Sequence, residues 1–186
     1  LVVTGANVAA TDTNAIILGA ATVSGTYGIT AGGAVTDSGT QEIAGVTTIS
    51  ASGQTVTLNT ATNNFADEVR ITGAAVTVVD EDAIELGASA VSGAYSITAG
   101  GAVTNSGALV IPNTSTISAS GQAVTLNESS NNFGTLAITG ANVAVTDTNA
   151  IILGAATVTG TYAVTAGGAV TDSGTQEITG VTTISA

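Results

Sequence analysis

Residues 29–39 read ITAGGAVTDSG, and the stretch returns as ITAGGAVTNSG at 97–107 and as VTAGGAVTDSG at 164–174. The copies are thus almost evenly spaced along the chain. The similarity extends outward from them, because residues 1–51 differ from residues 136–186 at seven positions. Self-similarity at a fixed period is the sequence signature of a repeat protein. We therefore divide the chain into superrepeats 1–68 and 69–135 and an incomplete third, 136–186.

A shorter period lies within the superrepeat. Apolar β-branched residues begin strand-like segments at one long and two shorter steps per superrepeat, at Val3, Ile29, Ile49, Ile71, Ile97, Ile117, Ile138, Val164 and Ile184. Inside these segments apolar residues alternate with Thr and Ser, which is the pattern of a strand with one buried face. Asp-Ser-Gly and Asn-Asn turn signals separate the segments. The steps predict about eight solenoid coils of about 20–26 residues, three in each complete superrepeat.

These patterns predict an all-β fold, a parallel β-solenoid in which each coil lies on the next at a spacing of ~4.8 Å. Small branched residues would fill the narrow interior, and outward Thr and Ser would keep strand propensity at the surface. Eight coil steps would give a rod of roughly 40 Å. An α-solenoid would need helical periodicity, a propeller would need a period of about 40–50 residues, and a β-sandwich would not explain the superrepeat.

The composition excludes several functional classes. Thirteen carboxylates accompany one cation, Arg70, and the net charge is −12, whereas binding to nucleic-acid phosphates needs a basic surface. The chain has no Cys, His or Lys, which removes disulfides, thiolate sites and most nucleophilic or general-base chemistry. No apolar run approaches the ~20 residues that span a bilayer. We predict no nucleic-acid partner, no membrane insertion, no required cofactor and no enzymatic activity.

The densest acidic segment runs from Asp80 to Asp82 and is followed by Glu85. Carboxylate oxygens at turns are the ligands that Ca²⁺ prefers, so Asp80, Asp82 and Glu85 are the candidate calcium site. A solvated acidic turn explains the same residues, and their spacing does not match an EF-hand loop. Paired carboxylates could also serve glycoside hydrolysis, with 67–68 as a second pair. The other superrepeats, however, carry Thr, Asn and Ile where the acidic segment stands.

The few aromatic residues recur at matching places of the superrepeat. Tyr27, Tyr95 and Tyr162 are expected to cover the rim of the longer coil, with sugar binding along the rod as the alternative. Phe65 and Phe133 follow an Asn-Asn pair and are expected to plug the interior at a corner. Thr-x-Thr occurs in some coils and is missing from others, so the sequence does not predict a regular ice-binding ladder.

The units at 29–39, 97–107 and 164–174, together with ISASGQ-x-VTLN at 49–59 and 117–127, resemble the β-strand repeats of large bacterial surface proteins. These are the filamentous-haemagglutinin-like and autotransporter adhesins. The resemblance covers the whole chain and implies a right-handed parallel β-helix, export across the outer membrane and a role as a stalk or adhesive fibre. No functional residue is carried over, because the repeat region of that family has no fixed site.

From the sequence we expect a structural and interaction protein, an extracellular segment of a bacterial cell-surface adhesin or stalk that gives reach and a repetitive surface. Its partners would be itself, by end-to-end or lateral stacking, or the surface of a host or neighbouring cell. A self-assembling extracellular filament or sheath subunit is the alternative in the same class. A β-helical polysaccharide-active enzyme fragment is the alternative from another class. The terminal units lack distinct caps, which favours a segment of a longer protein.

Overall fold

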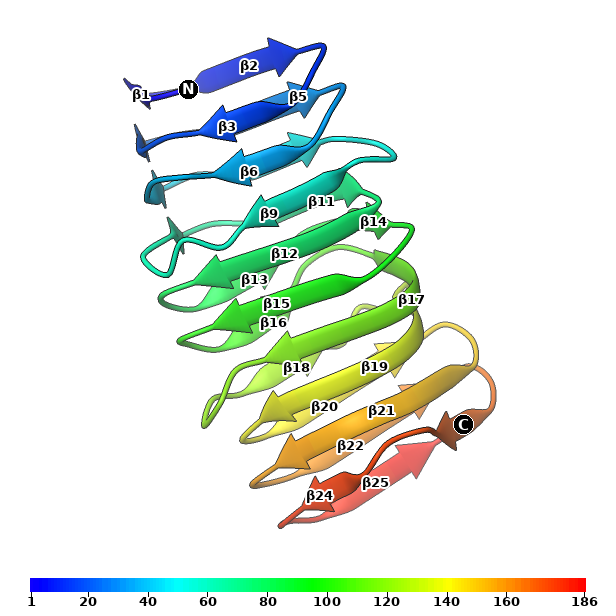
Figure 1. The fold of residues 1–186 in the computed structure, drawn as a ribbon. Helices are drawn as coiled ribbons and strands as arrows, with labels where there is room; N and C mark the ends of the chain where they lie inside the picture. Colours follow the sequence, from blue (N-terminus) through cyan, green and yellow to red (C-terminus); the bar gives the residue numbers. More distant parts are fainter.

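Short strands separated by Gly, Asn and Asp turns wind into a three-sided coil in the computed structural model, which describes residues 1–186 (Figure 1). The strands pair in parallel between successive turns, and the chain makes about nine turns. At ~4.8 Å per turn the rod is about 43 Å long. The expected all-β parallel solenoid is thus confirmed.

The strands stack in three columns, which we call sides I, II and III. Side I contains β1 (Val3–Gly5), β4 (Ala21–Val23), β7 (Gln41–Ile43), β10 (Asn64–Phe65), β13 (Ile84–Leu86), β16 (Val103–Asn105), β18 (Val124–Leu126), β20 (Val143–Asp147), β22 (Tyr162–Ala166) and β25 (Thr182–Ser185). Side II contains β2 (Val8–Asp12), β5 (Tyr27–Ala31), β8 (Thr47–Ser50), β11 (Val69–Gly73), β14 (Ser89–Val91) and β23 (Val170–Asp172). Side III contains β3 (Ile16–Leu18), β6 (Val35–Asp37), β9 (Thr55–Leu58), β12 (Ala75–Asp80), β15 (Tyr95–Ala99) and β24 (Gln176–Ile178).

Three long strands turn a corner and belong to two sides. They are β17 (Leu109–Ser118), β19 (Asn132–Gly140) and β21 (Ile151–Val158). In β17 the first residues pair with β14 on side II, whereas the last four pair with β15 on side III. In Figure 1 the nearer strands β12 and β15 run from right to left, the fainter β25 runs from left to right, and the chain descends from N to C. The coil is therefore right-handed, which is the hand that parallel crossover connections favour.

The superrepeat does not close on a whole number of turns. Superrepeat 1 forms ten strands, β1 to β10, whereas three turns of a three-sided coil use nine. Each superrepeat therefore makes three and a third turns, and its equivalents move on by one side. The tyrosines show this shift, because Tyr27 begins β5 on side II, Tyr95 begins β15 on side III, and Tyr162 begins β22 on side I.

This geometry corrects the predicted three coils per superrepeat and eight coils in all. The shorter steps are true turns, since Ile29 pairs with Ile49 and Ile49 pairs with Ile71. The long step, such as that from Ile71 to Ile97, is a turn and a third. Val78, and not Ile71, is the residue of the preceding turn that pairs with Ile97. Equivalent residues occupy the same place in every superrepeat, but that place lies on a different side of the coil in each superrepeat.

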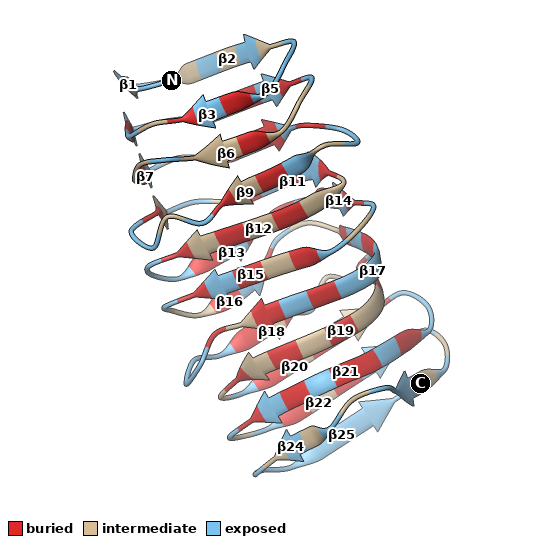
Figure 2. Cartoon of the chain, viewed as in Figure 1, coloured by how far each residue is buried: buried red, intermediate tan, exposed pale blue.

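Inward positions hold mainly the small branched residues that the alternation predicts, and Figure 2 shows the buried and less buried bands that alternate along the strands. The buried apolar side chains form one continuous core cluster of 43 residues along the rod. Phe65 and Phe133 are both buried in it, which confirms that they plug the interior. Outward positions on the same strands carry mostly Thr, Ser and Ala, so most strands alternate between buried and more exposed residues. Hydrophobic burial of one face of every strand is what holds successive turns together.

Glycine is required at a few of the corners. Gly53 and Gly121, in the two Ser-Gly-Gln turns, have φ angles of +72° and +75°, a region that residues with a Cβ seldom adopt. At other corners the constraint is space, because the backbone of the preceding turn lies against the glycine Cα. These positions let the chain change direction without widening the coil.

Candidate functional site

The buried acidic side chains of the rod lie where one superrepeat meets the next. Asp80 ends β12, and its Oδ1 accepts the N–H of Asp82 at 2.9 Å while its Oδ2 accepts the N–H of Phe65 at 2.8 Å. Asp147 repeats both contacts at the next junction, with the N–H groups of Asn149 at 2.9 Å and Phe133 at 2.6 Å. Each carboxylate therefore ties the turn that follows it to the phenylalanine of the preceding coil.

The three predicted calcium ligands do not converge on one point. Asp80 is buried and uses both oxygens on backbone N–H groups, whereas Asp82 and Glu85 are exposed, in the turn and on β13 respectively. No group of three or more Asp, Glu, His or Cys side chains is arranged to hold a metal ion. Burial raises the pKa of Asp80, and the two N–H donors oppose that rise. The structure thus gives Asp80 a role in joining coils.

In the second acidic pair, 67–68, one of the two carboxylates forms an ion pair. Arg70 on β11 donates a hydrogen bond to Glu68, and this contact lowers the pKa of the Glu68 carboxyl. The Glu68 side chain also lies over Gly87, where it leaves no room for a Cβ. Glu68 is therefore held by Arg70 of its own turn and lies against Gly87 of the next turn, and Asp67 beside it remains exposed. The two carboxylates do not flank a shared cleft.

The three tyrosines lie inside the rod, so the expectation that they cover a rim was wrong. Tyr27, Tyr95 and Tyr162 are each 1% exposed, and none of them offers its ring to a sugar at the surface. Burial raises the pKa of Tyr27 and of Tyr162 to about 12 and raises the pKa of Tyr95 as well. The rings are buried because each tyrosine is the first inward-facing residue of its strand.

The hydrogen bonding of the buried tyrosine hydroxyl differs between the superrepeats. Tyr27 Oη donates a hydrogen bond to Gln41 Oε1 at 3.3 Å. In superrepeat 2 the residue at the place of Gln41 is Leu109, and Tyr95 Oη has no hydrogen-bond partner. A buried polar group without a partner costs free energy. Tyr162 Oη also lacks a partner, although Gln176 stands at the place of Gln41. Tyr27 is therefore the tyrosine whose hydroxyl is hydrogen-bonded.

A network of buried amides at the predicted Asn-Asn turns supports the corner before each phenylalanine. Asn63 Oδ1 accepts the N–H of Gln41 at 2.9 Å, and Asn63 Nδ2 donates to Asp37 Oδ2 at 2.7 Å. Asn131 takes the same place in superrepeat 2, where its Oδ1 accepts the N–H of Leu109 at 3.0 Å. The available signal was the recurrence of Asn-Asn-Phe at one phase of the superrepeat, but the sequence does not show which Asn points inward.

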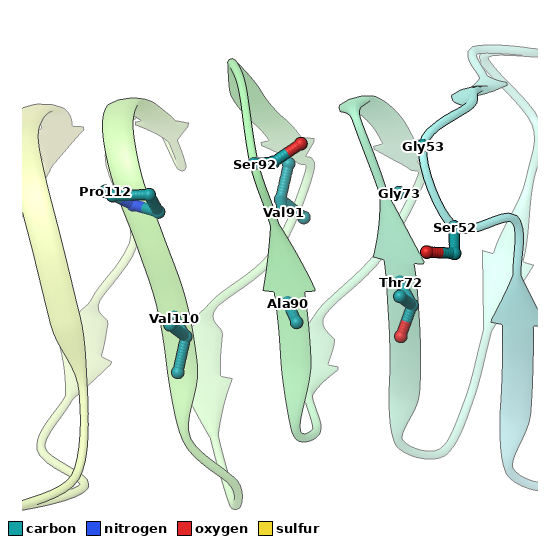
Figure 3. A pocket seen from close by; sticks show the side chains of 9 residues that line it. All are labelled: Ser52, Gly53, Thr72, Gly73, Ala90, Val91, Ser92, Val110 and Pro112. Carbon is teal, nitrogen blue, oxygen red and sulfur yellow. The ribbon is translucent and has the colours of Figure 1, made fainter.

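The largest surface hollow lies on side II and has a volume of about 330 Å³. Figure 3 shows Thr72, Ala90 and Val110 in a row across three successive rungs, with the Ser52–Gly53 turn at one end and Pro112 at the other. The hollow is open and shallow. None of its lining residues carries a charge, so it lacks the groups that would fix a charged substrate or run acid–base chemistry.

The bridging role of Asp80 can be tested with a substitution that preserves its shape. Asp80→Asn leaves one side-chain oxygen for two N–H donors and turns an amide NH₂ toward one of them. We expect the free energy of unfolding, measured by urea denaturation with circular dichroism, to fall by about 2 kcal/mol. Asp12→Asn is the matched control, because Asp12 accepts only the N–H of Asn14. Equal losses in the two variants would contradict the bridging role.

The unequal tyrosine hydroxyls give a second test. Tyr27→Phe removes a hydrogen-bonded hydroxyl and should lower the free energy of unfolding by about 1 kcal/mol, whereas Tyr95→Phe removes an unpaired one and should leave stability unchanged or raise it. Thermal and urea unfolding of both variants measure the difference. A loss in Tyr95→Phe as large as that in Tyr27→Phe would show that the Tyr95 hydroxyl has a partner.

Buried tyrosines also set the alkaline limit of the fold. The pKa of Tyr27 and Tyr162 is about 12 in the folded chain against an ordinary value of 10.0, so the folded state holds the phenolic protons more tightly than the unfolded state. Stability is therefore intact below about pH 10 and falls as the pH rises toward about 12. We expect phenolate absorbance to appear in the same cooperative step as the loss of strand signal. Phenolate that appears before unfolding would contradict the burial of these rings.

Comparison with known families agrees with the internal period. The sequence model of the family described as "Repeats of unknown function (DUF5649)" matches residues 5–72, 73–139 and 140–186. No curated protein and no solved structure matches the chain. The rod also contains no helix long and apolar enough to cross a bilayer. The three matches run consecutively over nearly the whole sequence, and the chain therefore belongs to the DUF5649 repeat family.

Proposed function

We propose that the chain is a structural repeat segment of a bacterial cell-surface adhesin or stalk, located outside the cell, where it gives reach and a repetitive interaction surface. The observation that carries the proposal is the continuity of the coil through both superrepeat junctions. Asp80 and Asp147 join consecutive superrepeats by the same contacts. An array of such units would extend as one rod instead of as separate domains on linkers.

Reach in this proposal comes from the rise of the coil. Each turn adds ~4.8 Å, so a superrepeat of three and a third turns adds about 16 Å. The net charge of −12 disfavours nonspecific association between rods. The absence of Cys suits a chain that crosses a membrane unfolded and folds outside. These properties support a spacer whose length is set by the number of superrepeats.

A self-assembling filament is the second candidate. Parallel strands of the coil pair from one turn to the next, and the same edge-to-edge pairing between two copies would build a fibre. No comparable observation favours a polysaccharide-active enzyme, because the side II hollow has no carboxylate among its lining residues and the tyrosine rings are buried.

The location outside the cell can be tested with antibodies against residues 1–186. We expect them to label intact cells of the organism that produces the protein, at a distance from the membrane in immunoelectron microscopy, because the segment is proposed to stand out as a stalk. Lysed cells provide the control and should bind no more antibody than intact cells. Labelling that appears only after lysis would contradict a surface role.

Electron microscopy of the purified chain separates the two candidates. The stalk proposal expects isolated short rods, with and without a calcium chelator. Long uniform fibres would favour the filament instead. Fibres that disappear on chelation would show that calcium bridges the acidic turns, where Asp82 and Glu85 are exposed.

A further inference from the structure

We infer that superrepeat 1 carries a binding site for a neutral sugar ring, in a hollow on side I that is bordered by Thr22, Glu42 and Asn64. The inference deepens the proposed function, on which its biological meaning rests, because it names the chemical class of partner. The hollow lies at the corner where the chain leaves side I, and its volume is about 210 Å³. Sites for drug-sized ligands have volumes of about 300–1,000 Å³, so this smaller hollow suits a single ring.

A row of polar side chains crosses three successive turns at this hollow. Thr22 on β4 pairs with Glu42 on β7, and Glu42 pairs with Asn64 on β10. Neighbouring members of the row are therefore about 4.8 Å apart along the rod. Their side chains take part in no hydrogen bond within the chain, whereas both side-chain groups of Asn63 beside them are engaged. The row is thus free to bind a ligand.

Apolar groups complete the hollow, and they belong to Val23, Ile43, Ala44 and Ala66. Such a wall accepts the C–H face of a sugar ring, while a few polar groups at its edge fix the orientation of the ligand. Glu42 offers acceptor oxygens, whereas Thr22 and Asn64 each offer both a donor and an acceptor. Because each sugar hydroxyl also donates and accepts, the row supplies the mixed hydrogen bonding that neighbouring hydroxyls need.

The charge of the site disfavours other small ligands. Glu42 is the only charged residue of the hollow, and the chain has a net charge of −12, so an acidic ligand is repelled. One carboxylate falls short of the roughly six to eight oxygen ligands that Ca²⁺ takes. An ammonium group would pair with Glu42 but would leave the donor of Asn64 unused. A neutral polyhydroxyl ring uses all three side chains.

Superrepeat 2 forms a hollow at the equivalent place without most of the polar row. Residues 90–92, 110 and 112 border the side II hollow of Figure 3 and are the equivalents of 22–24, 42 and 44. Ala90 stands in place of Thr22, and Val110 stands in place of Glu42. In superrepeat 3 the first two members return, because Thr157 pairs with Glu177. The hollow is therefore a feature of the superrepeat, and the polar row distinguishes its copies.

One open hollow of this size is expected to bind weakly. It covers part of a ring, so we expect a Kd on the order of 1 mM for a single sugar. An array in which several superrepeats carry the row could engage a polysaccharide at more than one point, which raises the overall affinity without any new contact.

A nuclear magnetic resonance titration of the purified chain tests the site. The probes are the methyl glycosides of glucose, galactose and mannose, with methylammonium as the cationic comparison. At about 10 mM, roughly ten times the expected Kd, we expect at least one glycoside to shift the backbone amide signals of residues 23–24, 43–44 and 64–66. Methylammonium at the same concentration should leave these signals in place.

The variants come from the chain's own superrepeats. Glu42→Val introduces the residue of superrepeat 2 and should weaken glycoside binding at least tenfold. The reverse pair, Ala90→Thr with Val110→Glu, should create a second site whose binding shifts the amides of residues 91–92 and 111. Glu85→Ile is the matched control, because Glu85 is an exposed carboxylate on side I outside the hollow, and it should leave binding unchanged. Circular dichroism confirms that each variant is folded.

The inference is overturned if none of the three glycosides shifts the signals at the hollow, or if Glu42→Val binds as tightly as the unchanged chain. Shifts caused by methylammonium alone would also overturn it. The proposed function fails separately. Antibody labelling confined to lysed cells would overturn the surface location and leave glycoside binding by the purified chain as it is, whereas loss of the sugar site would leave the location of the protein unchanged.

Discussion

Closure of each turn on three sides is the constraint from which the rest of the structure follows. About twenty residues must return the chain to its starting side, one strand spacing further along, so that backbone hydrogen bonds to the preceding turn can form on all sides. The interior enclosed by so short a turn is narrow. It is filled mainly by Val, Ile, Leu and Ala, and the larger Tyr and Phe enter it once per superrepeat. The charged side chains that it admits are the two junction aspartates, whose oxygens accept backbone N–H groups.

The superrepeat is out of step with that three-sided coil, and the mismatch shapes the outer surface. Each superrepeat has ten strands in place of nine. Each copy of the repeated segment therefore begins one side further around the coil than the copy before it. The core tolerates this because the three sides are built from the same kinds of residue, so Tyr27, Tyr95 and Tyr162 fill equivalent space on different sides. The outer surface, in contrast, is changed by this shift from side to side. A surface that the sequence repeats in one direction is therefore displayed in three directions.

Much of the fold could be predicted from the sequence, and the failures have a common physical cause. The alternation around Ile29, Ile49 and Ile71 predicted strands, inward residues and true turns, because period-two alternation and the shorter steps are local properties of the chain. The long step was interpreted wrongly as one turn. A sequence repeat shows which residues are equivalent, but it does not show on which side of the coil each of them lies. The tyrosines were misplaced for a related reason, since a large ring was not expected to fit a narrow interior. Asp80 was interpreted either as a calcium ligand or as part of a solvated acidic turn. Its burial could not be predicted, because its two N–H partners come from separate turns that only the folded coil brings together.

Backbone nuclear Overhauser effects in the middle superrepeat test the central claim, the ten-strand superrepeat on a three-sided coil, most directly. Residues 69–135 differ enough from the other superrepeats for their amide signals to be assigned separately. The account predicts interstrand contacts between the backbones of Val78 and Ile97 and of Ile49 and Ile71, and none between the backbones of Ile71 and Ile97. A backbone contact between Ile71 and Ile97 would mean that the long step is a single turn, and it would contradict the three and a third turns of each superrepeat.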